Sequence, residues 1–381
     1  MTRHRLHTRL CDILDIEYPI ILAGMGGYCG PTLAAAVSNA GGLGVLGCTG
    51  FPLDRLAEMI RNTRSLTNRP FGVDVLMPFP VGDLPRDFSM NIEFPERHVE
   101  FVERLKQEFG IPEPKDWRQP VFLSLEHSMR EIEICLEERV PVFVSGLGNP
   151  ASLVPQAHAQ GTKVIACVGN VRDARRVVEG GVDILVASGH EAGGHVGRIG
   201  TMALVPQVVD AVRPTPVVAA GGIADGRGLA AALALGACGA WVGTAFLVSH
   251  EAHVDAIEMG LFAQWEIDHW KQRIIECTEM DTVVTRSYSG KTMRNLKNRW
   301  SEAWEKPGAP PPLPMPLQYM MIWETMEGAR EGGVRDVRLV PTGQIAGMIR
   351  ERKSAGQIIE EMVGGAVMAM EEMSSSRQHL Q

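Results

Sequence analysis

The residues of this sequence best suited to chemistry form a glycine-rich run at 188–197, which contains His190 and His195. Histidine titrates near neutral pH, so it can donate or accept a proton during catalysis. The adjacent pair Gly193 and Gly194 lets the backbone approach a bound ligand closely. We therefore predict that His195 is a catalytic residue that handles a proton beside a ligand. The alternative is a loop histidine that only satisfies backbone carbonyls.

Two further glycine-containing segments, at 219–226 and 241–244, carry backbone groups that could bind a phosphate. Exposed N–H groups at Gly222, Gly243 and Thr244 would hold a phosphate dianion without lysine or arginine. Barrels of alternating strands and helices commonly bind phosphate at the loops after strands seven and eight. The order and spacing of the two segments therefore predict a phosphate-bearing ligand, although each glycine pair alone is also typical of a tight turn.

Other candidate residues lie in or just after apolar strand segments. Gly24 lies at the end of the first such segment, where a glycine-rich end could contact a ring edge or a phosphate or form a bare turn. Asp74 interrupts an apolar run, so its carboxylate needs hydrogen-bond donors from a ligand or from a neighbouring strand end. Cys167 is a weaker candidate, because a cysteine in a strand is usually a small hydrophobic residue. We expect His253, in a segment after the strands, to lie on the surface.

Short apolar segments recur along the chain, each ending in a turn residue and most followed by an alanine- or leucine-rich stretch with helical spacing. This rhythm predicts the α/β class and a (β/α)8 TIM barrel. A doubly wound open sheet is the competing architecture, but no Gly-x-Gly-x-x-Gly turn follows the first segment. The eight strand candidates are Tyr18 to Met25, Leu43 to Gly47, Phe71 to Met77, Val140 to Ser145, Lys163 to Val168, Ile184 to Ser188, Pro216 to Ala220 and Ala240 to Phe246.

Two stretches exceed what a minimal barrel needs. We expect a barrel over residues 1–250 with an insertion at about 78–120, after strand three, since a connection of that length is normally a lid, a subdomain or a disordered segment. Residues 251–381 are expected to form a mostly helical C-terminal extension that packs back on the barrel. Its proline-rich segment 307–316 predicts a linker or a surface crossing.

Composition limits the class of partner. The 381 residues carry a formal net charge of −8, which gives no electrostatic reason to bind nucleic acid or an anionic membrane. No run of about 18 apolar residues is present, so a membrane span is not expected. The seven scattered cysteines contain no Cys-x-x-Cys pair, which favours a reducing, cytoplasmic location without a metal site. The sequence contains no nucleophile-elbow, zinc-protease or Walker motif. We therefore predict that the glycine-rich strand ends bind an organic cofactor.

Four blocks of the sequence, at residues 19–47, 71–78, 191–197 and 216–247, occur in the order found in a known family. The chain resembles the FMN-dependent nitronate monooxygenases, formerly called 2-nitropropane dioxygenases. It is also similar to the related NAD(P)H-dependent flavin oxidoreductases and to the FMN enoyl-acyl carrier protein reductase. The resemblance covers most of residues 18–247.

The resemblance implies an FMN cofactor, with its phosphate near Gly222 and Thr244 and its ring near the end of strand one. It implies that His195 acts as a base or proton donor, and that a small alkyl nitronate is oxidised with O2. Five positions depart from the family's usual residues. Leu22 replaces a glutamine, Gly24 a proline, Asp74 an asparagine, Ser188 a glutamine and Cys167 a more polar or basic residue. The expected cofactor-binding residues are Ala23, Gly24, Met25, Asp74, Cys167, Ser188, Gly193, Gly194, Gly221, Gly222, Trp241, Val242, Gly243 and Thr244.

Two alternatives to the nitronate reaction remain open. One is an NAD(P)H-dependent flavin oxidoreductase acting on a bulkier substrate such as an acyl-CoA or a quinone, with NAD(P)H as co-substrate. The other is a flavin-free barrel that binds a phosphorylated ligand without redox chemistry. A homodimer contact through the extension is a further expectation.

Overall fold

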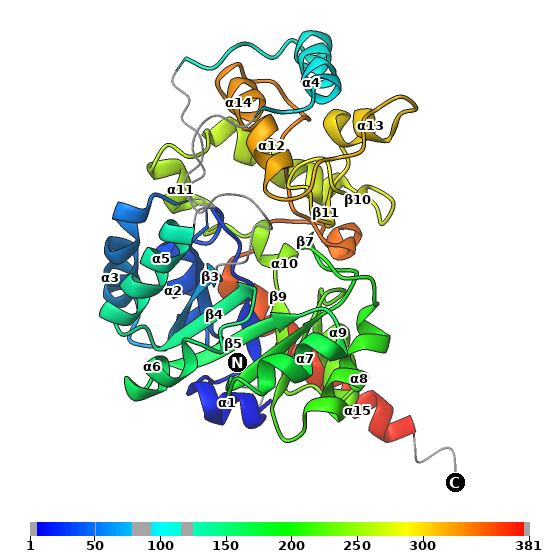
Figure 1. Cartoon of the computed structure of the whole chain (residues 1–381). Helices are drawn as coiled ribbons and strands as arrows, with labels where there is room; N and C mark the ends of the chain where they lie inside the picture. The colour runs from blue at the N-terminus through cyan, green and yellow to red at the C-terminus, as the bar shows by residue number, and fades with distance from the viewer. Residues whose placement is uncertain (1–5, 50, 78–92, 116–124, 377–381) are drawn as a thin grey trace.

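The fold is an eight-stranded parallel barrel covered at one end by a second layer of helices and a small sheet (Figure 1). The computed structural model describes residues 6–49, 51–77, 93–115 and 125–376. The strands follow one another in the order β1-β9-β8-β6-β5-β4-β3-β2, and a parallel bridge between Ile21 and Leu43 closes the ring. The predicted TIM barrel is therefore confirmed. Its strands are β1 (Ile20–Leu22), β2 (Gly44–Gly47), β3 (Phe71–Leu76), β4 (Val142–Leu147), β5 (Lys163–Val168), β6 (Ile184–Ser188), β8 (Val217–Ala220) and β9 (Ala240–Val242).

These strands are mostly apolar because both of their faces are buried, and Asp74 of β3 is an exception. Alternate side chains such as Ile165 and Val186 fill the interior of the barrel. The intervening residues, such as Ala166 and Leu185, pack outward against the helices. The outer helices are α2 (Pro31–Asn39), α3 (Leu56–Leu66), α5 (Leu125–Glu137), α6 (Val154–Ala159), α7 (Val171–Val178), α8 (Thr201–Val212), α9 (Gly226–Ala234) and α15 (Ala355–Ser376). Helix α1 (Arg9–Leu14) packs instead against the residues that fill the barrel interior.

The strand prediction was wrong at its eighth member. We expected a strand from Ala240 to Phe246, but β9 ends at Val242 and the short helix α10 (Thr244–Leu247) begins after Gly243. A short apolar run is compatible with either a strand or a buried helix, and only the glycine marks the change. The turn at Gly243 brings the following residues over the end of the barrel.

The second layer consists of part of the predicted insertion and most of the C-terminal extension. Phe101 in the insertion packs against Trp304 in the extension, with ring centroids 4.8 Å apart. Besides helices, the layer contains an antiparallel sheet in the order β10-β11-β7, which was not expected from the sequence. The elements of this layer are β7 (Gly194–His195), α4 (Glu96–Phe109), α11 (Val254–Glu258), α12 (Gln264–Glu276), β10 (Thr282–Thr285), β11 (Met293–Leu296), α13 (Arg299–Glu305) and α14 (Leu317–Glu331), with the 3-10 helix η2 at Gln344–Met348.

The chain returns from this layer to the barrel in α15, which packs against α9 and α2. Helices α15 and α9 pack closely where they cross, and the glycine at position 226 permits this. A Cβ atom on Gly226 would lie only 2.2 Å from the backbone nitrogen of Ala366. Residues 78–92 and 116–124 of the predicted insertion lie outside the described residues. No helix in the described part of the chain has both the length and the apolar character needed to cross a membrane.

Candidate active site

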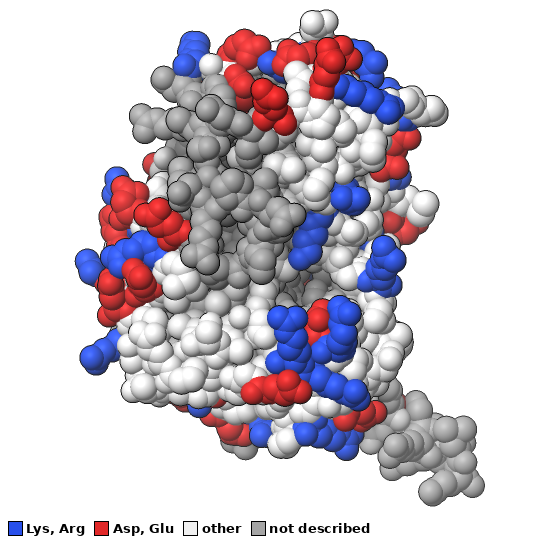
Figure 2. Space-filling model, viewed as in Figure 1, with Lys and Arg blue, Asp and Glu red and all other residues white. Residues whose placement is uncertain are grey.

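A cavity of about 1360 Å³ lies between the C-terminal ends of the barrel strands and the second layer. Single small-molecule sites usually occupy about 300–1,000 Å³, so this cavity can hold a cofactor and a second molecule. Lys291 and Arg176 are among its lining residues. In Figure 2, Lys and Arg side chains gather near the centre of the visible face, where the barrel meets the second layer.

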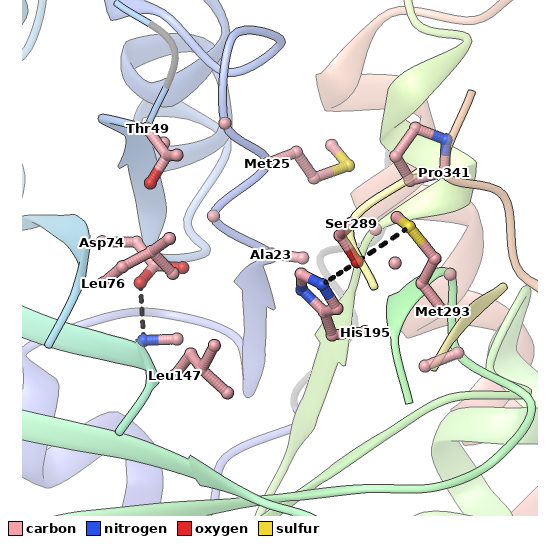
Figure 3. A pocket seen from close by; sticks show the side chains of 18 of the residues that line it. Ala23, Met25, Thr49, Asp74, Leu76, Leu147, His195, Ser289, Met293 and Pro341 are labelled. Carbon is pink, nitrogen blue, oxygen red and sulfur yellow. Dashed lines mark hydrogen bonds between the residues drawn. The ribbon is translucent and has the colours of Figure 1, made fainter. Parts of the chain in front are cut away.

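His195 lies on one wall of this cavity and is held by the C-terminal extension. Its strand, β7, pairs with β11, where Met293 is its register partner. The Nε2 atom of His195 lies 3.0 Å from the Oγ atom of Ser289, and Figure 3 shows both side chains on the same wall. The hydroxyl of Ser289 in turn lies 3.1 Å from the carbonyl oxygen of Lys291. The extension thus holds the backbone of His195 through β11 and its imidazole through Ser289.

This contact pattern favours one tautomer of His195. The carbonyl of Lys291 can only accept a hydrogen bond, so the single hydroxyl proton of Ser289 is directed to it. Ser289 then accepts from Nε2–H of His195, which leaves Nδ1 unprotonated in the neutral ring. Burial, together with the nearby positive charge of Lys291, lowers the pKa of His195 to about 4. The imidazole is therefore a neutral base at physiological pH.

The neighbouring residues His190 and Glu191 position the loop. Nδ1 of His190 donates to the carbonyl of Gly197 over 2.8 Å, so this histidine serves the loop's own backbone. Glu191 accepts from the backbone N–H of Thr201 at the start of α8, over 2.9 Å. The hydroxyl of Thr201 lies 2.9 Å from the carbonyl of Gly221, so the loops after β6 and β8 are connected.

The predicted phosphate-binding glycines lie together at the edge of the cavity. Gly221 and Gly222 both have positive φ angles, 91° and 74°, which favour glycine and set the direction of the loop after β8. Gly243 and Thr244 follow β9, the next strand in the barrel, and line the same cavity. The first N–H groups of α10 have no acceptor within their own helix, so they are available to an anion.

A segment of the extension, residues 341–345, crosses these loops. The N–H of Gly343 donates to Oγ1 of Thr244 over 2.9 Å, and the N–H of Gln344 donates to the carbonyl of Glu191 over 3.0 Å. A Cβ atom on Gly193 would lie only 2.8 Å from the nitrogen of Gly343, so this crossing requires glycine. The extension therefore forms a third wall of the predicted phosphate site.

Asp74 lies opposite His195 across the cavity (Figure 3). Its Oδ1 atom accepts a hydrogen bond from the backbone N–H of Gly146 over 2.7 Å. The carboxyl is therefore bonded to a neighbouring strand end, which was one of its two expected roles, while it also lines the cavity. Burial raises the pKa of Asp74 well above its usual range.

Fourteen of the fifteen predicted site residues line the cavity. Val242 does not: it is 1% exposed and packs in the layer between strands and helices. Alternation along β9 explains the difference, since its neighbour Trp241 faces the cavity. The fourteen lining residues are Ala23, Gly24, Met25, Asp74, Cys167, Ser188, Gly193, Gly194, His195, Gly221, Gly222, Trp241, Gly243 and Thr244.

Sequence reasoning missed several lining residues. The run at 146–149 follows the predicted strand Val140 to Ser145, overlaps the last two residues of β4 and contains two glycines, the same signal that identified the other strand ends. Ser289 and Gly343 gave no comparable signal, because they follow no barrel strand. The expected surface position of His253 was also wrong: it is 3% exposed, and its ring centroid lies 5.1 Å from that of Tyr28.

The second layer adds an aromatic wall to the cavity. Tyr319, Trp323 and Met326 of α14 face it, since residues three, four and seven apart share one side of a helix. The rings of Tyr319 and Trp323 lie 5.1 Å apart. Glu327 and Arg330 of the same helix also line the cavity, so this wall combines aromatic and apolar side chains with an ion pair, whereas the opposite side of the cavity is lined largely by glycines.

The donor set and the shape of the cavity fit the flavin implied by the resemblance. Glycine-rich strand ends leave space for a flat ring, and the loops after β8 and β9 offer backbone N–H groups to a phosphate. Within the described ranges, no group of three or more His, Cys, Asp or Glu side chains could hold a metal ion.

Comparison with known proteins gives consistent results. The family described as nitronate monooxygenase matches residues 7–365. A putative monooxygenase of Mycobacterium tuberculosis is 35% identical over 376 residues, covering 94% of this chain and 96% of that protein. A probable nitronate monooxygenase of Staphylococcus saprophyticus is 35% identical over 312 residues, covering 78% of this chain and 80% of that protein.

Two solved structures extend the comparison. A nitroalkane oxidase from Streptomyces ansochromogenes superimposes with a TM-score of 0.78 at 29% identity, covering 96% of this chain and 99% of that chain. FabK from Thermotoga maritima superimposes with a TM-score of 0.73 at 32% identity, covering 97% of this chain and 99% of that chain.

Proposed function

The chain belongs to the nitronate monooxygenase family of flavin-dependent oxidoreductases, and from this we propose that it is an FMN enzyme that oxidises a small alkyl nitronate with O2. One observation carries the proposal: His195, a neutral base, faces a glycine-lined cavity at the C-terminal end of the barrel. Family membership argues against the non-redox barrel, since this is a family of oxidoreductases.

In this proposal the chain's own residues bind the cofactor and orient its ring. Gly222, Gly243 and Thr244 would hold the FMN phosphate through backbone N–H groups and the threonine hydroxyl. The loop that contains Gly193 and Gly194 would lie beside the ring. When bound, FMN supplies the redox chemistry by taking electrons from the substrate and passing them to oxygen.

His195 and Lys291 have complementary roles toward an anionic substrate. The positive charge of Lys291, which disfavours a second proton on His195, favours a negatively charged ligand in the same region. A nitronate is already the deprotonated form of a nitroalkane, so the unprotonated Nδ1 of His195 would take that proton from the neutral nitroalkane, while Ser289 holds the opposite nitrogen. The second layer covers the cavity and keeps the reacting groups away from bulk water.

Aerobic turnover tests this proposal. The FMN-loaded protein is incubated with propyl-2-nitronate while nitrite release and oxygen consumption are measured together. We expect both to rise with enzyme concentration, and a flavin-loaded protein that releases no nitrite would refute the nitronate reaction.

A second function is favoured by one specific observation, the aromatic wall that α14 adds to a cavity larger than a cofactor and a small nitronate require. We propose as the alternative an NAD(P)H-dependent flavin oxidoreductase acting on a bulkier substrate, such as a quinone or an acyl-CoA. NADPH oxidation that depends on added quinone, without nitrite release from nitronates, would favour it over the first proposal.

A further inference from the structure

Asp74 is a carboxyl group at the cavity wall without a compensating positive charge. Its residue is 8% exposed, and among the described residues its one hydrogen-bond donor is the backbone N–H of Gly146, 2.7 Å from Oδ1. No salt bridge is formed by Asp74 among the described residues. A buried carboxylate with a single neutral donor is strongly destabilised relative to its protonated form.

Two glycines make the space that this carboxyl occupies. A Cβ atom on Gly24 would lie 2.2 Å from Oδ2 of Asp74, and one on Gly146 would lie 2.6 Å from Oδ1. Side chains at either position would displace the carboxyl group. The ends of β1 and β4 therefore form a close-fitting slot, in which Asp74 has little freedom to seek another partner.

The titratable groups around Asp74 are three thiols and the carboxylate of Glu131, and Glu131 lies 3.5 Å from Nε2 of His127, which also lines the cavity. Cys29, Cys48 and Cys167 lie close enough to Asp74 that a negative charge on its carboxyl group would raise the pKa of each of these thiols. The charged group that acts on it is Glu131 of α5, itself 3% exposed. The negative charge of Glu131 and burial both raise the pKa of Asp74.

We propose that Asp74 is an uncharged carboxylic acid in the folded protein and that its O–H donates a hydrogen bond to an acceptor atom of the bound flavin ring. Oδ1 already accepts from Gly146, so Oδ2 carries the proton and is the donor. A neutral acid offers the same combination as an amide, one acceptor and one donor, without placing a negative charge beside the ring. The inference rests on the flavin of the proposed function and not on its nitronate substrate.

The isosteric variant Asp74→Asn tests this directly. FMN is titrated into flavin-free protein between pH 6 and pH 10, and binding is followed by quenching of flavin fluorescence. At pH 6 to 7 we expect the wild type and Asp74→Asn to bind FMN with equal affinity, because both offer a neutral donor. At alkaline pH the wild type should lose roughly tenfold in affinity as Asp74 ionises, whereas Asp74→Asn should not.

Two further variants sharpen the test. Asp74→Ala removes the donor and should weaken FMN binding by roughly fivefold to tenfold even at pH 6. Glu131→Gln removes the neighbouring negative charge, so the alkaline loss should begin at a lower pH than in the wild type. Difference infrared spectroscopy of the wild type minus Asp74→Asn at pH 7 should show the carbonyl band of a protonated carboxylic acid.

Two results overturn the inference alone. These are FMN binding in which the wild type and Asp74→Asn respond identically to alkaline pH, or an infrared difference that shows a carboxylate at pH 7. A wild type that binds no FMN at any pH would overturn both the inference and the proposed cofactor. The infrared result reports the protonation state of Asp74 itself. It therefore separates a true effect on the carboxyl group from a loss of FMN binding that arises only because Asp74→Asn does not fold.

Discussion

The Nε2 atom of His195 lies 3.0 Å from the Oγ atom of Ser289, although 94 positions separate them in the chain. The first residue belongs to the loop after β6 of the barrel, and the second to the turn between β10 and β11 of the extension. The pairing of β7 with β11 brings them together. The extension therefore contributes directly to the site, and the barrel alone does not complete it.

Replacing His195 with glutamine should reduce kcat/KM with the neutral nitroalkane, whose proton must be removed, by about 10²- to 10⁴-fold, the usual contribution of a positioned acid or base. FMN content, measured from the visible spectrum, should remain that of the wild type, since glutamine keeps a polar side chain at the cavity wall. His250→Gln is the matched control, because His250 is exposed and is not part of the cavity wall. Unchanged turnover in His195→Gln would exclude His195 from the mechanism.

The pH dependence of kcat/KM should report the neutral state of His195. Its pKa is lowered to about 4 from an ordinary value near 6.5, so the basic form is fully populated above about pH 5 and is lost as the pH falls through 4. Activity should therefore remain level from pH 6 to 7. An acid limb centred near pH 6.5 would contradict this account of the histidine.

Ser289→Ala should reduce kcat by roughly tenfold with little change in KM, because the imidazole loses the acceptor that selects its tautomer. The acid limb of kcat/KM should move to lower pH, since the charged imidazolium loses a stronger hydrogen bond than the neutral ring. Ser289→Thr keeps the hydroxyl and should restore the wild-type profile. A shift of the limb toward higher pH would show that Ser289 does not act as an acceptor.

Gly343→Val should weaken FMN binding by roughly tenfold, because its side chain would enter the contact between the extension and the phosphate loops. A Cβ atom there would lie 3.0 Å from the carbonyl of Glu191 and 3.2 Å from Oγ1 of Thr244. Gly356→Ala, whose added Cβ meets nothing nearer than 3.9 Å, is the matched control. Equal FMN affinity in the two variants, measured by fluorescence titration, would remove residues 341–345 from the binding site.

The barrel could be predicted because each buried parallel strand is a short apolar run that ends in a turn residue. The same rule located the glycines at 221–222 and 243, since the site of such a barrel lies at its strand ends. The rule was wrong at Val242 of β9, which we assigned to the site. Successive side chains of a strand point to opposite faces, and that of Val242 points into the core. The strand candidates alone could not decide which face each residue occupies.

The contribution of the extension could not be predicted from local patterns. β7 contains two residues, and its pairing with β11 depends on a contact across about 100 positions that leaves no periodic signal. Ser289 and Gly343 therefore gave no sign of their place in the site. Asp74 was identified as unusual, but its slot depends on Gly24 and Gly146, which come from two different strand ends. The homodimer remains a prediction.

Anaerobic mixing of the FMN-loaded protein with an alkyl nitronate tests the central claim most directly. The absorbance of oxidised flavin near 450 nm, roughly the usual position of that band, is followed in a stopped-flow instrument, and NADPH is mixed in a parallel experiment. We predict rapid loss of the flavin absorbance with the nitronate, which needs no proton removal and is therefore little affected by His195→Gln, and recovery when O2 is admitted. Rapid loss with NADPH and none with the nitronate would contradict the account and support the bulky-substrate oxidoreductase.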